Sequence, residues 1–303
     1  MTAPQDNSYF AVGRICILIA LLMTGITLVL SENLGIAVVG ILILGSMFAH
    51  AIELQHQCLH YSAFKSRRAN RIIGVLLGLP TLTSFQAYRR SHLEHHRNLG
   101  TSADTPFFTY RFIKSPSLGA LLFDLFGVAH IKASVSAIFG NGDSRLISLP
   151  QGDETANNSE RLDYALMGFM LVCAALTMMI FGSAFVLKIW IVPFLFVAQP
   201  LHFLIELPEH LGCNERSTDV FHNTRTIVGS KFSRWFTNFN NLHVEHHLEP
   251  TISMNQLPAV FVSVQGQHKH LEQTYWQFYR SLYKSIAPQS LAIAANNRAG
   301  RSA

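Results

Sequence analysis

Histidines recur in three groups at helical spacing along this chain. They are His56 and His60 in HQCLH, His92, His95 and His96 in HLEHH, and His243, His246 and His247 in NNLHVEHHLEP. Residues three and four apart share one face of a helix, so each group aims its imidazoles at one point. The chain must therefore fold so that helical segments far apart in sequence can present these faces to one another.

Metal binding is the simplest common explanation for these eight histidines. Neutral imidazole is a frequent ligand of iron, zinc, copper and nickel. Eight ring nitrogens exceed what one ion uses, so the pattern indicates a two-metal centre. A histidine-rich storage tract would be a contiguous run, and a zinc site needs only three or four ligands. Iron is therefore the favoured metal.

The composition indicates a membrane protein with substantial polar regions. Of the 303 residues, 49% are hydrophobic and 14% are charged, against roughly a quarter charged in a typical soluble domain. The net charge of +5 would suit nucleic acid or an anionic membrane face. The basic residues flank apolar runs, which favours the membrane and argues against a nucleic-acid partner. The four cysteines are scattered, so we expect no disulfide framework and no thiolate metal site.

Four apolar runs are long enough to cross a bilayer as helices. They cover residues 11–30, 34–52, 164–187 and 190–207. We expect an all-α integral membrane protein in which these helices form two hairpins. The basic residues between Lys65 and Arg71 favour the cytoplasmic side. Both termini and all three histidine groups then lie on that side, in a cytoplasmic cap that carries the metals.

The segments between these spans complete the expected layout. Residues 72–82 are too short to span upright and should lie at the interface. Residues 117–139 indicate an interfacial amphipathic helix, with a further span as the alternative. Residues 141–160 are polar and rich in turn formers, which predicts a cytoplasmic loop. One domain is expected to cover residues 1–286, and residues 287–303 are expected to be disordered. The short polar start and the compact domain favour a bacterial inner membrane.

A candidate ninth ligand lies where the fourth apolar run ends. His202, Glu206 and His210 fall at i, i+4 and i+8, although Pro208 bends or ends that helix. His210 is the better ligand because it lies at the membrane exit. Glu206 could accept a proton from a ligand imidazole or hold a water on the metal. His202 is equally consistent with a core histidine bonded to a carbonyl and with a role in the site.

Other polar residues near the clusters allow two interpretations each. Asp104, Asn240 and Asn241 could orient ligands, or they could cap helices and turns. Glu94 and Glu245 occupy the same position in the two HxxHH groups, and either ligand-orienting carboxylates or a solvated helix face would explain them. The remaining histidines lack a partner at helical spacing and are expected at the surface or at an interface: His50, His130, His222, His268 and His270.

HQCLH, YRRSHLEHHRNLGT and NNLHVEHHLEP together resemble the three histidine boxes of the integral-membrane fatty acid desaturase family. The likeness includes ELPEHLG and covers roughly residues 50–258. It implies a non-haem di-iron centre that activates O2 with two electrons from a partner and removes two hydrogens from an unactivated carbon chain. The matching boxes imply that the eight histidines above are the iron ligands. His210 matches the additional histidine of acyl-CoA desaturases, and Glu206 the place of their water-holding polar residue.

Two differences from that family's motifs bear on the expected substrate and electron donor. The first box is HxxxH, as in acyl-lipid desaturases, which leaves a lipid-bound and a carrier-bound acyl chain both open. The chain holds no His-Pro-Gly-Gly haem-binding stretch, so a separate donor of ferredoxin, rubredoxin or cytochrome b5 type is expected. A related hydroxylase or ketolase acting on a hydrocarbon, lipid or carotenoid is the alternative. A membrane metal transporter ranks far behind, because the spans contain few polar residues.

Overall fold

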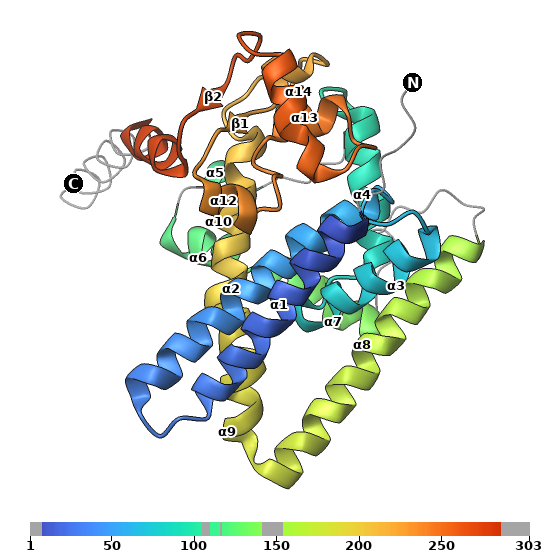
Figure 1. Cartoon of the computed structure of the whole chain (residues 1–303), viewed down its shortest axis with the longest axis vertical. Helices are drawn as coiled ribbons and strands as arrows, with labels where there is room; N and C mark the ends of the chain where they lie inside the picture. The colour runs from blue at the N-terminus through green and yellow to red at the C-terminus, as the bar shows by residue number, and fades with distance from the viewer. Residues whose placement is uncertain (1–7, 105–109, 116, 141–153, 286–303) are drawn as a thin grey trace, which may run out of the picture.

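The computed structural model describes residues 8–104, 110–115, 117–140 and 154–285. Residues 287–303, expected to be disordered, lie outside this range. The described chain is mostly helical, which confirms the all-α expectation (Figure 1). Within it, the β-structure consists of β1 (Thr226–Ile227) and β2 (Leu271–Glu272), which pair in parallel, and an isolated bridge between Thr226 and Leu242.

Four helical stretches are long and apolar enough to cross a membrane, as the sequence predicts. They are α1 (Ser8–Val29), α2 (Leu34–Leu59), Ala156–Phe181 within α8 (Glu154–Phe181), and Ser183–His210. Each exceeds the roughly 20 residues that a bilayer requires. The last combines α9 (Ser183–Val186), the π-helical η2 (Leu187–Ile191) and η3 (Phe194–Ala198), and α10 (Gln199–His210).

The third span differs from its predicted bounds at both ends. Helix α8 ends at Phe181 rather than near residue 187, because Gly182 adopts a left-handed conformation with φ of 84°. At its other end, residues 154–160 are helical, so the loop predicted over residues 141–160 is wrong for this part. Its residues 141–153 lie outside the described range. Glu160 pairs with Arg90, and Asp163 lies 3.1 Å from Arg71. These ion pairs dock the polar start of α8 on the neighbouring helices α3 (Arg67–Gly78) and α4 (Phe85–Asn98).

The segment expected to form one interfacial helix over residues 117–139 is broken. It forms α6 (Leu118–Leu125) and α7 (Val128–Ile138), which meet at an angle of 51°. Gly127 supplies the break, with φ of 58°, a conformation that glycine adopts without steric cost. Whether this pair lies at the interface or enters the bilayer stays a prediction.

Shorter helices connect the spans to the histidine groups. After α2 come α3 (Arg67–Gly78), η1 (Leu79–Thr81) and α4 (Phe85–Asn98), followed by α5 (Arg111–Lys114). Ser84 caps α4 by accepting a hydrogen bond from the Ala87 amide. The buried ring of Phe85 lies close to Gly74 of α3, which lets these two helices approach closely.

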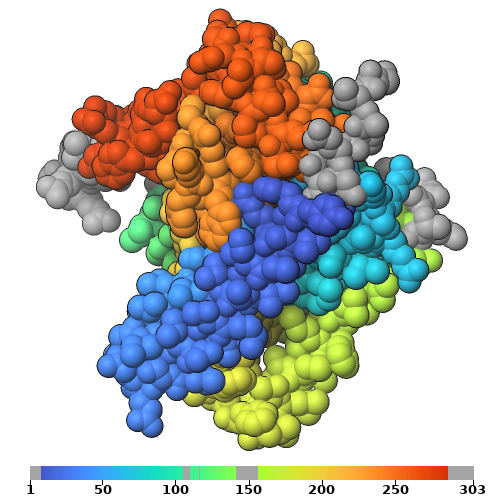
Figure 2. All heavy atoms as spheres, in the orientation of Figure 1, coloured from blue at the N-terminus to red at the C-terminus, as the bar shows by residue number. Residues whose placement is uncertain are grey.

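Residues 211–285, which we call the cap, cover one end of the long helices (Figure 1). The cap contains α11 (Val220–Asn223), α12 (Lys231–Phe236), α13 (His243–Leu248), η4 (Met254–Gln256), α14 (Leu257–Ser263) and helical residues 275–285. The α1–α2 and α8–α9 turns lie at the opposite end. Figure 2 shows the cap directly against the end of α1, where Arg14 donates a hydrogen bond to the Trp235 carbonyl at 2.5 Å.

Candidate metal centre

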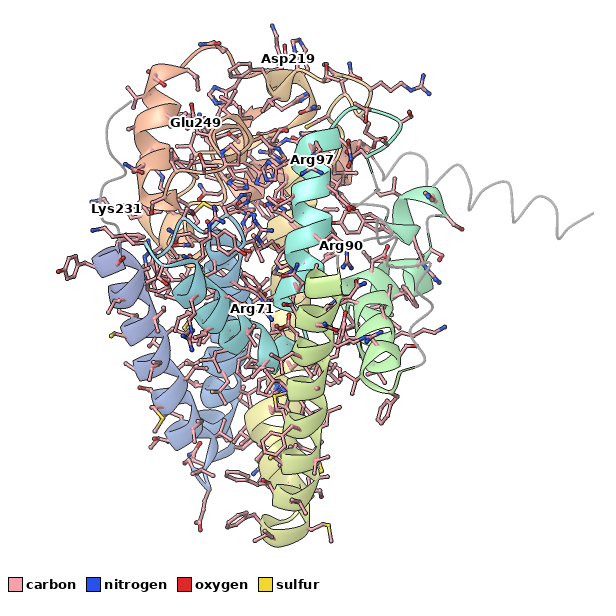
Figure 3. The ribbon with its side chains drawn as sticks, turned by 90° about the vertical axis from the view of Figure 1, so that its right-hand side faces the viewer. Arg71, Arg90, Arg97, Asp219, Lys231 and Glu249 are labelled. Carbon is pink, nitrogen blue, oxygen red and sulfur yellow. The ribbon has the colours of Figure 1, made fainter. Side chains whose placement is uncertain are left out.

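Four segments bring nine histidines together beneath the cap. Helix α2 supplies His56 and, at its C-terminal cap, His60; α4 supplies His92, His95 and His96; α10 supplies His210; and α13 supplies His243, His246 and His247. Figure 3 shows side-chain nitrogens gathered where α4 meets the cap. Every histidine that the sequence proposes as a ligand therefore lies in this cluster.

Within this cluster, the potential ligands fall into two groups in space, and the first group takes histidines from all three sequence motifs. It contains His56, His60, His92, His96 and His246, whose nearest ring nitrogens all lie within 4.8 Å of one another. The Nε2 atom of His92 lies 2.7 Å from that of His56 and 2.9 Å from those of His60 and His96. Nitrogens this close around one point form a pocket of a size suited to a single ion.

The second group shares His210 between two sets of potential ligands. One set is His95, His210 and His247; the other is Glu209, His210 and His243. The Nε2 atoms of His95 and His210 are 3.2 Å apart, and so are those of His243 and His247. Four imidazoles and a carboxylate thus surround a second point next to the first group.

Hydrogen bonds at the outer ring nitrogens decide where the protons sit. The Nδ1 atom of His95 faces the Asp104 carboxylate at 3.1 Å, and that of His210 faces the Asn223 carbonyl at 2.9 Å. These oxygens only accept, so each Nδ1 carries a proton, and in the form that binds metals each ring then presents a bare Nε2. Two bare lone pairs 3.2 Å apart repel unless a cation lies between them. The side chains present therefore fit a metal ion.

The pKa values of the cap and α4 histidines support the neutral, ligating form. Burial, reinforced by the neighbouring imidazoles, lowers the pKa well below its ordinary value at His92, His96, His243, His246 and His247. Burial also lowers the pKa of His60, with His56 and Arg89 as further causes. At neutral pH these rings are unprotonated, which is the form that binds metals.

The polar residues expected near the ligands have different surroundings. Asp104 contacts His95, as described, whereas the Asn241 side chain donates to the Ile227 carbonyl at 2.6 Å and accepts from Thr237 at 2.8 Å. Asn241 thereby fixes the loop that leads into α13. The Glu206 carboxylate lies 3.2 Å from His202 Nδ1. The roles of these residues at a metal stay predictions.

Two buried acidic residues lie beside the predicted ligands. Glu209, which the sequence analysis does not single out, lies 3.2 Å from His243 Nε2; its position directly before His210 is the available signal. Glu245 is completely buried and bonds Thr226 at 2.7 Å and His268 at 2.5 Å. His268 is therefore buried inside the cap and not at the surface. This network holds α13 in place from the side opposite the ligands.

A pocket of about 430 Å³ adjoins the first histidine group. Tyr88 forms part of its wall and stacks on His56 with ring centroids 6.2 Å apart. His202 and Glu206 also line it, together with apolar residues such as Phe203. A substrate in this pocket would lie beside the imidazole cluster, separated from His56 by one aromatic ring.

The fold and the site define a class of membrane protein in which helices present histidine-rich clusters, suited to metal ions, at one end of a bundle. Residues 34–279 match the model of the fatty acid desaturase family, and the chain belongs to that family. It is therefore an integral membrane protein of this family.

The chain is also similar to a curated protein, the dihydrorhizobitoxine desaturase of Bradyrhizobium elkanii. The two are 26% identical over 226 residues, which cover 70% of this chain. The match covers 63% of that protein, somewhat less than two thirds of its length.

Proposed function

We propose that the protein is a di-iron, O2-dependent desaturase that introduces a double bond into a fatty acyl chain, either lipid-linked or carrier-linked. The observation that carries this proposal is the convergence of nine imidazoles on two adjacent points beside a pocket. A methylene C–H bond offers a side chain no acidity or polarity to exploit. Two irons with O2 would supply the oxidising power that such a bond requires.

The side chains of this protein have defined tasks in that reaction. The box histidines and His210 would hold the two irons, with Asp104 and the Asn223 carbonyl fixing two of the rings. Neutral imidazoles suit iron. The packed cap excludes water from the centre. Electrons would come from a separate donor of ferredoxin, rubredoxin or cytochrome b5 type.

The pocket favours a second candidate substrate with polar groups. Its wall includes hydroxyl, carboxylate and imidazole side chains, among them Ser91, Asp124 and His130. Their hydrogen bonds to Ala87, Phe112 and Thr81 still leave accepting lone pairs on the Ser91 hydroxyl and the Asp124 carboxylate for a polar substrate. A polar substrate is thus the alternative within the same chemistry. A substrate panel should include dihydrorhizobitoxine, which gives the similar protein its name.

We further propose two membrane hairpins whose cap and termini face the cytoplasm of a bacterial inner membrane, in one domain up to residue 286. Both interhelical turns lie at the end opposite the cap (Figure 1). The basic residues Arg67 and Arg68 follow closely on His60, next to the histidine groups. Such charges favour the cytoplasmic side.

Mass spectrometry of the lipids and acyl species of an expressing host tests the reaction. The wild type should form a product two hydrogens lighter than its substrate. His246→Ala should abolish it, because His246 belongs to the first group. His222→Ala is the matched control: its side chain is 43% exposed and pairs with Asp219, so the product should persist.

Other outcomes separate the alternatives. A product one oxygen heavier would assign the protein as a hydroxylase, and a carbonyl product as a ketolase. Full activity of His246→Ala would overturn the metal assignment. If no host species changes, purified protein supplied with the substrate panel and a reductant repeats the comparison, and its iron content is measured alongside.

A further inference from the structure

We propose that Glu209 is itself a metal ligand, so that the second metal is held by four imidazoles and one carboxylate while the first is held by imidazoles alone. This inference rests on the proposed di-metal function. It goes beyond the histidine boxes, because Glu209 lies outside all three of them. The residues concerned are Glu209 and His210 of α10 and Asn240 and His243 of the cap.

The end of α10 is fixed so that Glu209 points into the centre. The Glu209 carbonyl accepts a hydrogen bond from the Arg225 amide at 2.8 Å. The Arg225 guanidinium donates to the carbonyls of Pro208 and Leu211, the latter at 2.8 Å. These bonds satisfy carbonyls that a helix end leaves without partners. The Glu209 side chain, 8% exposed, is thus presented by a rigid backbone.

The hydrogen bonds of Asn240 indicate which atoms of Glu209 and His243 carry protons. Its Nδ2 donates to Glu209 Oε1 at 2.9 Å, because a carboxylate only accepts. The Asn240 Oδ1 must then face His243 Nδ1, 3.1 Å away, and that nitrogen carries the ring proton. The remaining atoms, His243 Nε2 and Glu209 Oε2, both present lone pairs and lie 3.2 Å apart. A cation between them resolves this conflict.

The charge of Glu209 leads to the same conclusion. Among the residues that the structure describes, no lysine or arginine nitrogen lies within 4 Å of its carboxylate. A buried carboxylate without a cation is costly. The neighbouring ligand His210 completes a three-residue metal set with Glu209 and His243. A divalent ion at this point would neutralise the carboxylate and occupy the bare nitrogens together.

The two metals would consequently differ in charge. Five neutral imidazoles leave the first ion with its full charge, whereas the carboxylate reduces the net charge of the second by one. The two ions should therefore be distinguishable by spectroscopy in the resting protein, before any substrate is added.

Iron retention by the purified 303-residue chain tests this assignment. Wild type, Glu209→Gln and Glu215→Gln are loaded with ⁵⁷Fe(II) without oxygen, and iron release to a chelator is followed. Glutamine keeps the volume and the bond to Asn240 but removes the charge. In Glu209→Gln one of the two irons should leave at least about 10-fold faster, since even residues that only orient ligands change metal affinity by 10–100-fold. Glu215 is an exposed carboxylate of the cap, so Glu215→Gln should release iron as the wild type does.

Mössbauer spectra of the same samples identify the iron affected. The wild type should give two signals of equal area, and Glu209→Gln should weaken or shift one of them. Glu209→His supplies another ligand and should retain both irons with one signal shifted. Unchanged spectra and release rates in Glu209→Gln would overturn the assignment and show that Glu209 only shares a proton with His243. Equal loss of both irons, or equal iron release in Glu209→Gln and Glu215→Gln, would also overturn it. A wild type that binds no iron would instead defeat the proposed function.

Discussion

Glu94 and Glu245 occupy the same position in the two HxxHH motifs, yet their surroundings differ. Glu245 is completely buried and bonds Thr226 and His268, whereas Glu94 is partly exposed. The sequence leaves two interpretations open for both residues: a carboxylate that orients a ligand, or a solvated helix face. The structure shows a buried network for Glu245 alone.

The difference predicts unequal effects of removing each carboxylate. Glu245→Ala leaves buried polar partners behind and should lower the free energy of unfolding by about 3–5 kcal/mol. Glu94→Ala should change it by less than about 0.5 kcal/mol. Thermal unfolding in detergent, with both variants loaded with metal in the same way, makes the comparison. Similar losses in the two variants would contradict the structural role assigned to Glu245.

The box histidines could be predicted individually because helical spacing determines which side chains share a face. The burial of a side chain depends on tertiary contacts, which cannot be inferred from the spacing of residues in the sequence. Spacing therefore does not predict Glu209, although it adjoins the predicted ligand His210, and it predicts His268 at the surface or at an interface. For Asn240 the sequence allows a capping and an orienting role; the structure shows it bridging Glu209 and His243.

At the scale of helices, the long apolar segments were the most predictable part. The positions where helices bend or end could not be predicted, because each depends on the backbone conformation of one residue. Gly127 bends the α6–α7 segment and Gly182 ends α8, both with positive φ, and neither glycine interrupts the apolar pattern. The polar start of α8 resembles a loop in sequence, and its ion pairs to α3 and α4 were not readable from spacing.

One helix contact gives a prediction at this scale. At Gly45 of α2, an added Cβ would lie 2.6 Å from the Pro193 carbonyl and collide with Val197. Gly45→Ala should therefore push α2 away from η3 and cost about 1–3 kcal/mol of stability. Gly13 of α1 has no atom within 4 Å of an added Cβ. Gly13→Ala is the control and should leave stability unchanged or raise it by up to about 1 kcal/mol.

Melting temperatures of the two glycine variants in one detergent check this expectation. Because α2 also carries His56, Gly45→Ala should in addition weaken metal retention. Equal melting temperatures for Gly45→Ala and Gly13→Ala would show that α2 and η3 are not packed as the structure describes.

At the scale of the whole molecule, the proposed orientation can be tested with two single-cysteine variants. Glu32 lies exposed in the α1–α2 turn and Arg216 lies exposed in the cap. With the four native cysteines replaced by serine, Glu32→Cys should react with a membrane-impermeant maleimide added to intact bacterial cells. Arg216→Cys should react only after lysis. The reverse pattern would place the cap outside and contradict the proposed cytoplasmic location.

The distribution of the ligands along the chain has a consequence for biogenesis. The first group needs His56, near the beginning of the described chain, together with His246, near its end. A nascent polypeptide therefore contains no complete site until the cap has been synthesised and has closed over the helices. Closure beforehand brings uncharged imidazoles together, and these repel one another less strongly than imidazolium ions would. The incoming metals would then act as a cross-link between segments of the described chain that are synthesised at different times.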